Sequence, residues 1–219
     1  PLKGLTSKEY AKELVKKFDP DKSQEYKADD PWKYEGNNTT HISVADKDGN
    51  MVAITKSINY YFGSGVAVDG YGFILNNQMD DFSPIPGEPN SVAPGKKPLS
   101  SMSPTIVLKE NGDPFMVLGA PGGSTIFVQV AQVISNVIDF GMDMQEAIEM
   151  PRIWDSLDNV VWYEDGISED EVKVLIEKGH EVFHYANDTF GYVQGILYKD
   201  DGTLHGGADS ATDGKAVGF

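Results

Sequence analysis

Small polar residues gather in three short segments of the chain, at 37–41, 76–82 and 98–105. Their hydroxyl and amide side chains could supply a nucleophile or hold a polar substrate. Asn, Ser and Thr are also the usual residues of turns and helix caps, so each segment alone has a purely structural interpretation. Three such segments in one chain weaken that interpretation and favour a binding or catalytic site.

A glycine pair, Gly122 and Gly123, directly precedes a segment with helical periodicity. Because glycine has no Cβ, consecutive backbone N–H groups at such a turn can converge on an oxygen that gains negative charge during a reaction. The same pair would also allow a helix to pack closely against a strand. The sequence leaves both interpretations open.

The histidines do not indicate a metal site. His180 and His184 lie in a segment that alternates like a strand, where four residues span about 13 Å, so they are poorly placed to share a zinc ion. His41 is better interpreted as a polar side chain near the start of a strand. The chain contains no Cys, no phosphate-binding loop and no G-x-S-x-G motif. We therefore expect neither a metal nor another cofactor.

Four segments, in chain order, resemble motifs of the gamma-glutamyltranspeptidase family. They read NNTTHISV from Asn37, NNQMDDFS from Asn76, KPLSSMSPT from Lys97 and GAPGGS from Gly119. Residues 39–219 resemble the catalytic small subunit of that family. Residues 1–38 resemble only the C-terminal tail of its large subunit, as a helix and an exposed loop that leads to the processing site. We therefore expect this chain to be a fragment of a longer precursor.

The resemblance implies an N-terminal-nucleophile hydrolase, an α+β fold in which two stacked, mainly antiparallel sheets lie between helices as an αββα sandwich. Such a precursor cleaves itself before a threonine, here between Asn38 and Thr39, so that the threonine becomes a new N-terminus. A threonine hydroxyl is a poor nucleophile without a nearby base. A freed α-amino group, whose pKa is about 8, is such a base at neutral pH.

The resemblance also implies roles for the residues of the reaction centre. Thr39 would attack the γ-carbonyl of a glutamyl donor, and Ser57 would hydrogen-bond and orient the Thr39 hydroxyl. Many family members carry threonine at the position of Ser57, but the hydroxyl is retained in either residue. Gly122 and Gly123 would supply the N–H groups that stabilise the oxyanion.

A second set of residues would bind the donor. By resemblance, Asn59, Gln78 and Asp81 would hold its α-ammonium group, with Asp81 as the charged partner. Ser100 and Ser101 would hydrogen-bond its α-carboxylate. Such a site discriminates well, because a donor that lacks either charged group leaves buried polar partners unsatisfied.

Two departures from the family pattern keep alternatives open. The family's arginine for the donor carboxylate belongs to the large subunit, which is the expected partner. The segment 84–97 is shorter than the lid of many members. We expect glutathione-like donors with amino-acid, peptide or water acceptors; a poly-γ-glutamate depolymerase or related amide acylase is the nearest alternative. A third hypothesis is an uncleaved, catalytically incomplete fragment that acts as a structural or binding module.

Composition excludes other classes of function. The 34 acidic and 18 basic residues give a formal net charge of −16, which disfavours nucleic acid as a partner. The longest apolar run is interrupted by polar residues, so no membrane span is expected. Export from the cell is expected from the resemblance alone. We also expect that a fragment without its large subunit exposes an apolar face and self-associates.

The elements that must position these residues follow from periodicity and turn signals. A helix is expected at 6–18, then an exposed loop to residue 38, and a hairpin at 39–46 and 51–55 around Asp48-Gly49. The order of strands, then helices, then strands indicates an α+β domain. The remaining predicted strands are 65–68, 73–76, 105–109, 115–118, 182–185, 192–198 and 203–205, and the remaining predicted helices are 126–138, 144–150 and 168–179.

Overall fold

The structure of the chain is a computed structural model that describes residues 8–17, 39–155, 160–185 and 189–218. The chain divides into two compact units. Residues 1–38 and 58–80 form the first unit, and residues 39–57 and 81–219 form the second. The hairpin that carries Thr39 therefore belongs to the same unit as the glycine pair.

The first unit contains the helix α2, Lys8–Lys17, which confirms the predicted N-terminal helix. Residues 6, 7 and 18 of the predicted helix and the predicted loop to residue 38 lie outside the described residues. The strands predicted at 65–68 and 73–76 are wrong, because the structure has only an isolated bridge there, between Ala67 and Ile74. Gly65, Gly70 and Gly72 have φ angles of 71°, 76° and 71°, which bend the backbone out of the extended conformation.

The second unit begins with the predicted hairpin of β1, Thr39–Ala45, and β2, Met51–Ser57. The strands pair antiparallel from Thr39 opposite Ser57 to Ala45 opposite Met51. Gly49 closes the turn with a φ of 87°, a conformation that glycine adopts without strain. The tight turn fixes the register and therefore places the two strand ends side by side.

The core lies between a four-stranded antiparallel sheet and two helices. The sheet order is β3 (Thr105–Leu108), β4 (Pro114–Gly119), β8 (Gln194–Tyr198) and β9 (Leu204–Ala208). The helices are α3, Ile126–Ile138, and α4, Met144–Glu149. Each of these six elements was predicted to within a few residues. The apolar side chains that fill the space between sheet and helices include Met116, Leu118, Val130, Val133, Met144 and Ile148.

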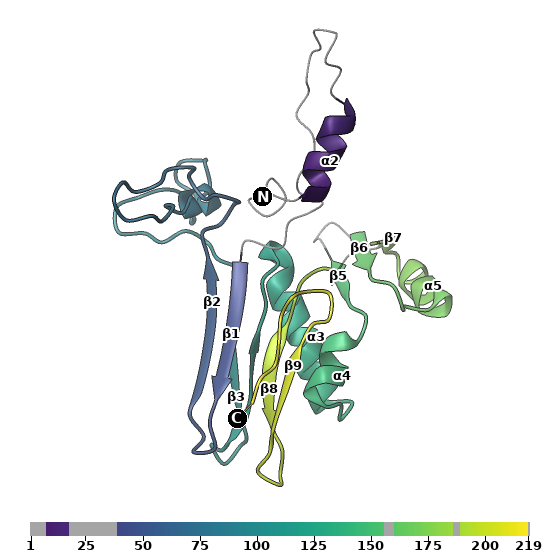
Figure 1. The fold of residues 1–219 in the computed structure, drawn as a ribbon. Helices are drawn as coiled ribbons and strands as arrows, with labels where there is room; N and C mark the ends of the chain where they lie inside the picture. Colours follow the sequence, from purple (N-terminus) through teal and green to yellow (C-terminus); the bar gives the residue numbers. More distant parts are fainter. Residues whose placement is uncertain (1–7, 18–38, 156–159, 186–188, 219) are drawn as a thin grey trace. The chain divides into compact units, whose positions relative to one another are not determined.

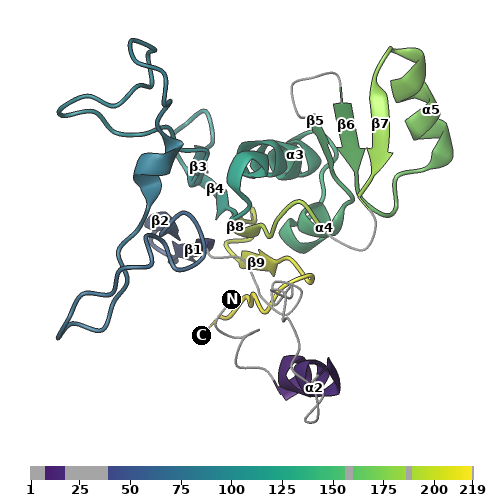
Figure 2. The same cartoon turned by 90° about the horizontal axis from the view of Figure 1, so that it is seen from above.

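Within the second unit these elements form layers, which Figure 2 shows from above. The hairpin lies on one side of the four-stranded sheet, and α3 and α4 lie on the other. The structure is therefore α+β, as predicted, with two stacked sheets and a helical layer. None of the described helices is long and apolar enough to cross a bilayer.

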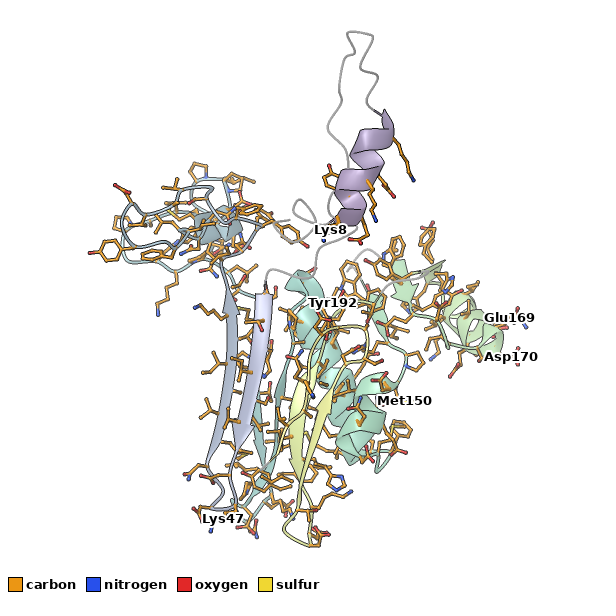
Figure 3. The ribbon with its side chains drawn as sticks, viewed as in Figure 1. Lys8, Lys47, Met150, Glu169, Asp170 and Tyr192 are labelled. Carbon is orange, nitrogen blue, oxygen red and sulfur yellow. The ribbon has the colours of Figure 1, made fainter. Side chains whose placement is uncertain are left out.

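A small third sheet was only partly predicted. It contains β5 (Ile153–Asp155), β6 (Val160–Tyr163) and the predicted β7 (Glu181–His184). β6 and β7 are parallel and are connected through the predicted helix α5, Glu169–Glu177. Ser168 and Glu171 form a capping box at the start of α5. Figure 3 shows the labelled side chains of Glu169 and Asp170 on the outside of this helix. Both residues lie in its first turn, where negative charge interacts favourably with the positive end of the helix dipole.

Candidate active site

The hydroxyl groups of Thr39 and Ser57 meet where the hairpin opens. Thr39 is the first residue of β1 and Ser57 is the last of β2, and the two are paired in the strand register. Thr39 Oγ1 donates a hydrogen bond to Ser57 Oγ at 3.0 Å. Both residues are half-buried. This bond directs the threonine proton towards Ser57.

His41 anchors the hairpin to the four-stranded sheet. Its buried ring bonds through Nδ1 to Thr55 Oγ1 at 2.7 Å and through Nε2 to Ser43 Oγ at 3.0 Å. Burial lowers the pKa of His41 from 6.5 to about 4, so the ring is neutral at pH 7. A Cβ on Gly119 would lie 2.3 Å from the His41 ring, so only glycine allows this approach. The interpretation of His41 as a polar residue near the start of a strand is confirmed.

Gly122 is enclosed by neighbouring atoms. Its φ is 134°, and a Cβ there would lie 2.8 Å from the Phe190 carbonyl oxygen, 2.8 Å from Thr125 Oγ1 and 2.9 Å from Gln129 Nε2. Gly123 begins a short 3₁₀ turn with a φ of 62°, and nothing lies within 4 Å of its Cβ position. Gly123 therefore faces open space, whereas Gly122 is fixed against the protein. We call residues 119–125 the glycine turn.

The glycine turn and Thr39 lie at the same end of the second unit. β4 ends at Gly119, and the His41 ring that contacts Gly119 lies two residues after Thr39. Figure 1 shows the start of β1 and the start of α3 at one end of the strands. The structure thus gathers a hydroxyl pair and a glycine backbone from distant parts of the sequence. This arrangement can support attack on a carbonyl by Thr39.

The predicted donor-binding residues lie in loops of both units. In the first unit, Asn59 has a φ of 72° and donates to the Asn77 carbonyl at 3.5 Å. Gln78 begins the 3₁₀ turn η2, Gln78–Asp81, and Asp81 ends it. The Asp81 carbonyl accepts a hydrogen bond from Asn90 Nδ2 at 2.7 Å.

Ser100 and Ser101 lie in the loop before β3. Ser100 Oγ accepts a hydrogen bond from the Met102 N–H at 3.3 Å, and the Ser101 carbonyl accepts one from Ser103 Oγ at 3.1 Å. Ser100 is exposed and Ser101 is half-buried. The proposed processing site includes Asn38, which lies outside the described residues, and Thr39, which is described.

Sequence reasoning missed a buried ionic cluster around Arg152. Arg152 Nε lies 3.1 Å from Glu164 Oε2, and its Nη2 lies 2.8 Å from Asp209 Oδ2. Burial lowers the pKa of Arg152, but the two carboxylates outweigh burial and raise it. Glu164 Oε1 accepts a hydrogen bond from the Phe190 N–H at 2.9 Å. The sequence offered one signal, because Arg152 is the single arginine in 219 residues.

Comparison with known proteins places these observations in a family. Residues 1–219 match the family model described as Gamma-glutamyltranspeptidase. The chain is 40% identical to the glutathione hydrolase proenzyme of Bacillus subtilis strain 168, over 100% of this chain and 40% of that protein. An acivicin-inhibited gamma-glutamyltranspeptidase aligns with a TM-score of 0.71 at 42% identity, over 80% of this chain and 99% of that one. A cephalosporin acylase from Bacillus halodurans aligns with a TM-score of 0.74 at 30% identity, over 98% of this chain and 39% of that one.

The chain spans about 40% of the length of the curated relatives it matches. The structural neighbours confirm the predicted N-terminal-nucleophile hydrolase fold. The match of the family model covers the hairpin, the glycine turn and all four sequence motifs. The chain belongs to the gamma-glutamyltranspeptidase family.

Proposed function

We propose that this chain carries the nucleophile of an enzyme that transfers or hydrolyses γ-glutamyl groups through an ester on Thr39. One observation carries the proposal: the Thr39 hydroxyl, at the first residue of β1, bonds to Ser57 at 3.0 Å. Cleavage between Asn38 and Thr39 would free an α-amino group beside that hydroxyl. The family membership and the glycine turn at the same end of the unit support the same reaction.

In the proposed reaction the α-amino group of Thr39 acts first as a base and then, once protonated, as an acid. The free α-amine of Thr39 takes the hydroxyl proton as Oγ1 attacks the γ-carbonyl of the donor. The N–H groups of Gly122 and Gly123 stabilise the resulting oxyanion. As the tetrahedral intermediate collapses, the α-ammonium returns the proton to the departing amine and the γ-glutamyl ester remains. Water then releases glutamate, or an acceptor amine takes the γ-glutamyl group.

Donor recognition is proposed for the loop residues that the family motifs contain. Asp81, with Asn59 and Gln78, is assigned to the α-ammonium group of the donor, because a carboxylate and amides match its charge and its N–H donors. Ser100 and Ser101 are assigned to the α-carboxylate, to which their hydroxyl groups can donate. Glutathione-like donors carry both charged groups on the γ-glutamyl moiety, which supports this class of substrate.

A large subunit from the same precursor is the proposed partner. Four residues on the hairpin face that points away from the four-stranded sheet are apolar and about half exposed, at 45–52%. They are Ile42, Val44, Val52 and Ile54. A sandwich of four layers needs one more layer on this face, and the chain spans only about 40% of its curated relatives. The remaining length is sufficient to supply that layer. Without it, the exposed face would favour self-association.

An amide acylase or a poly-γ-glutamate depolymerase is the second candidate. The likeness to the cephalosporin acylase extends over 98% of this chain, and the short segment 84–97 favours access for a bulky substrate. Donors with and without the α-ammonium group separate the two functions, because only a γ-glutamyl enzyme needs that group. Export from the cell is proposed from the family alone, and fractionation of the producing cells tests it.

Intact mass spectrometry of the full-length protein that contains this chain tests the proposal first. We expect wild type to break between Asn38 and Thr39 during incubation at neutral pH, and Thr39→Ala to stay intact. Thr39→Ser is the matched control, because it retains a hydroxyl and should cleave. A γ-glutamyl anilide then tests turnover by the mature protein. A wild-type protein that stays uncut and inactive would support the hypothesis of a structural or binding module instead.

A further inference from the structure

The peptide group that joins Gly122 to Gly123 is held by hydrogen bonds to its carbonyl oxygen. The Gly122 carbonyl accepts a hydrogen bond from Thr125 Oγ1 at 2.9 Å and another from the Thr125 N–H at 3.3 Å. This carbonyl and the Gly123 N–H belong to the same planar, trans peptide, so they point in opposite directions. A hydroxyl that fixes the carbonyl therefore fixes the direction of the N–H. It also polarises the peptide, which makes the N–H a stronger donor.

Gln129 influences which carbonyl, that of Gly122 or that of Phe190, accepts the hydroxyl proton of Thr125. Gln129 Nε2 donates to Thr125 Oγ1 at 2.5 Å and to the Phe190 carbonyl at 2.7 Å. Both amide protons are thereby used, and the Phe190 carbonyl has its donor. Thr125 Oγ1 lies 2.5 Å from the Phe190 carbonyl and 2.9 Å from the Gly122 carbonyl, and it can donate its one proton to either. The donor that Gln129 supplies to Phe190 favours donation to Gly122. This arrangement favours donation from Gln129 to Thr125 and from Thr125 to Gly122.

The Gln129 amide has one orientation that satisfies its neighbours. A flipped amide would direct Oε1 at the Phe190 carbonyl, and two acceptors would then repel each other. A Cβ on Gly191 would lie 2.2 Å from both Nε2 and Oε1 of Gln129, so the amide is also confined on that side. Gln129 is 1% exposed, and among the described residues its Oε1 has no hydrogen-bond partner. A buried glutamine that leaves one acceptor unsatisfied costs stability, which favours a role beyond packing.

The Arg152 cluster holds Phe190, the residue whose carbonyl accepts a hydrogen bond from Gln129. The Phe190 carbonyl receives Gln129, and the Phe190 N–H donates to Glu164, which Arg152 holds in turn. Arg152 is itself held by Asp209 at the end of β9. Phe190 is thus fixed through both of its backbone polar groups. The glycine turn therefore packs against Phe190, whose backbone is held by the buried Glu164 and Arg152.

We propose that Thr125 and Gln129 are positioning residues that aim and polarise the Gly123 N–H towards the oxyanion of the reaction. This inference rests on the proposed function of Gly123, and it assigns that function two residues that the sequence motifs did not include. Neither side chain touches the donor. Both act through the peptide between Gly122 and Gly123.

Steady-state kinetics of the mature, full-length protein test this proposal with a γ-glutamyl anilide. Loss of a whole oxyanion donor lowers kcat by about 10²–10³-fold, so loss of its positioning should cost less. We expect Thr125→Val to lower kcat by about 10- to 100-fold with KM changed less than about threefold, and Thr125→Ser to restore kcat. Gln129→Met should have a smaller effect, about threefold to tenfold, because the Thr125 proton is then shared between two carbonyls.

Gln132→Met is the matched control on the same helix. Gln132 Nε2 donates to the carbonyls of Val128 and Ile153, away from the glycine turn. We expect this variant to lower the melting temperature without lowering kcat. If Gln132→Met lowered kcat as much as Thr125→Val, or if Thr125→Val kept the wild-type kcat, the positioning role would be overturned.

Two further readouts separate this proposal from the proposed function. A γ-boronic acid analogue of glutamate forms a tetrahedral adduct with a nucleophilic hydroxyl, so Thr125→Val should weaken its binding about tenfold or more while glutamate binds unchanged. The amide resonance of Gly123, assigned by its disappearance in Gly123→Ala, should shift in Thr125→Val and not in Gln132→Met. This resonance does not depend on turnover. An inactive wild type with the expected shift would refute the γ-glutamyl function alone, and an active wild type without the shift would refute the positioning alone.

Discussion

The two halves of the candidate site are built in opposite ways. In the hairpin, Thr39 is half-buried at a strand end, and its hydroxyl bonds to one neighbouring hydroxyl, that of Ser57. In the glycine turn, three atoms lie less than 3 Å from the position that a methyl group on Gly122 would take. The nucleophile therefore lies at the end of a hairpin, whereas the backbone of the turn is enclosed by neighbouring atoms at Gly122.

This difference matches the chemical demands on the two halves. The proposed cleavage changes the nitrogen of Thr39 from an amide to an amine, so the start of β1 must rearrange. The N–H groups of an oxyanion hole act best when they are already aimed before the reaction begins. We therefore expect substitutions around the glycine turn to cost more free energy than substitutions at the hydroxyl pair.

The largest effect is expected at the base of the glycine turn. Arg152→Met would leave the carboxylates of Glu164 and Asp209 buried without their cation, and we expect the free energy of unfolding to fall by about 4 kcal/mol. Urea unfolding measures this. Lys109→Met is the control, because Lys109 pairs with an Asp200 that is 96% exposed, and it should have little effect. Equal effects of the two variants would mean that the buried cluster does not support the turn.

The second effect distinguishes the two glycines. Gly122→Ala would force a methyl group against the Phe190 carbonyl at a φ of 134°, and we expect a loss of about 3 kcal/mol in the free energy of unfolding. Gly123→Ala meets no atom within 4 Å at a φ of 62°, so about 1 kcal/mol is expected. The same urea titration measures both variants. If Gly123→Ala were the more damaging, the description of the turn as enclosed at Gly122 would be wrong.

The hairpin and the surroundings of the glycine turn also differ in how far the sequence predicted them. The hairpin follows from alternation and an Asp-Gly turn, which are local signals. The contacts that hold Gly122 join α3 to Phe190, some 60 positions away, and the Arg152 cluster joins residues 152, 164 and 209. No local pattern encodes such contacts, although the single arginine of an acidic chain was a usable signal.

Short and glycine-interrupted segments limited the fold prediction in the same way. The three residues of β5 and four of β6 carry too little alternation to be recognised, and they become strands through pairing with each other and with β7. The segments 65–68 and 73–76 alternate like strands, but positive φ angles at neighbouring glycines reduce them to one bridge. Long periodic elements such as α3 were predicted because packing and propensity agree there.

The third prediction uses pH to destabilise the protein through the buried His41 of the hairpin. The pKa of His41 is about 4 in the folded protein against 6.5 as its ordinary value. As pH falls from 6.5 to 4, the unfolded chain binds a proton that the folded chain does not, so stability falls in this window. We expect about 2 kcal/mol more loss between pH 7 and pH 5 in wild type than in His41→Asn. Urea unfolding at the two pH values measures the difference, and parallel pH profiles would contradict it.

The smallest effect is expected at the hydroxyl pair. Ser57→Ala removes the partner that directs the Thr39 proton, and we expect kcat for a γ-glutamyl anilide to fall about tenfold, equivalent to about 1.4 kcal/mol. Ser57→Thr keeps the hydroxyl and should retain kcat. Because cleavage before Thr39 and turnover both use this hydroxyl, the rate of maturation should be measured beside kcat. A variant that matures slowly but turns over normally would show that Ser57 orients Thr39 only while Asn38 is attached, and the α-amine alone would then orient the mature nucleophile.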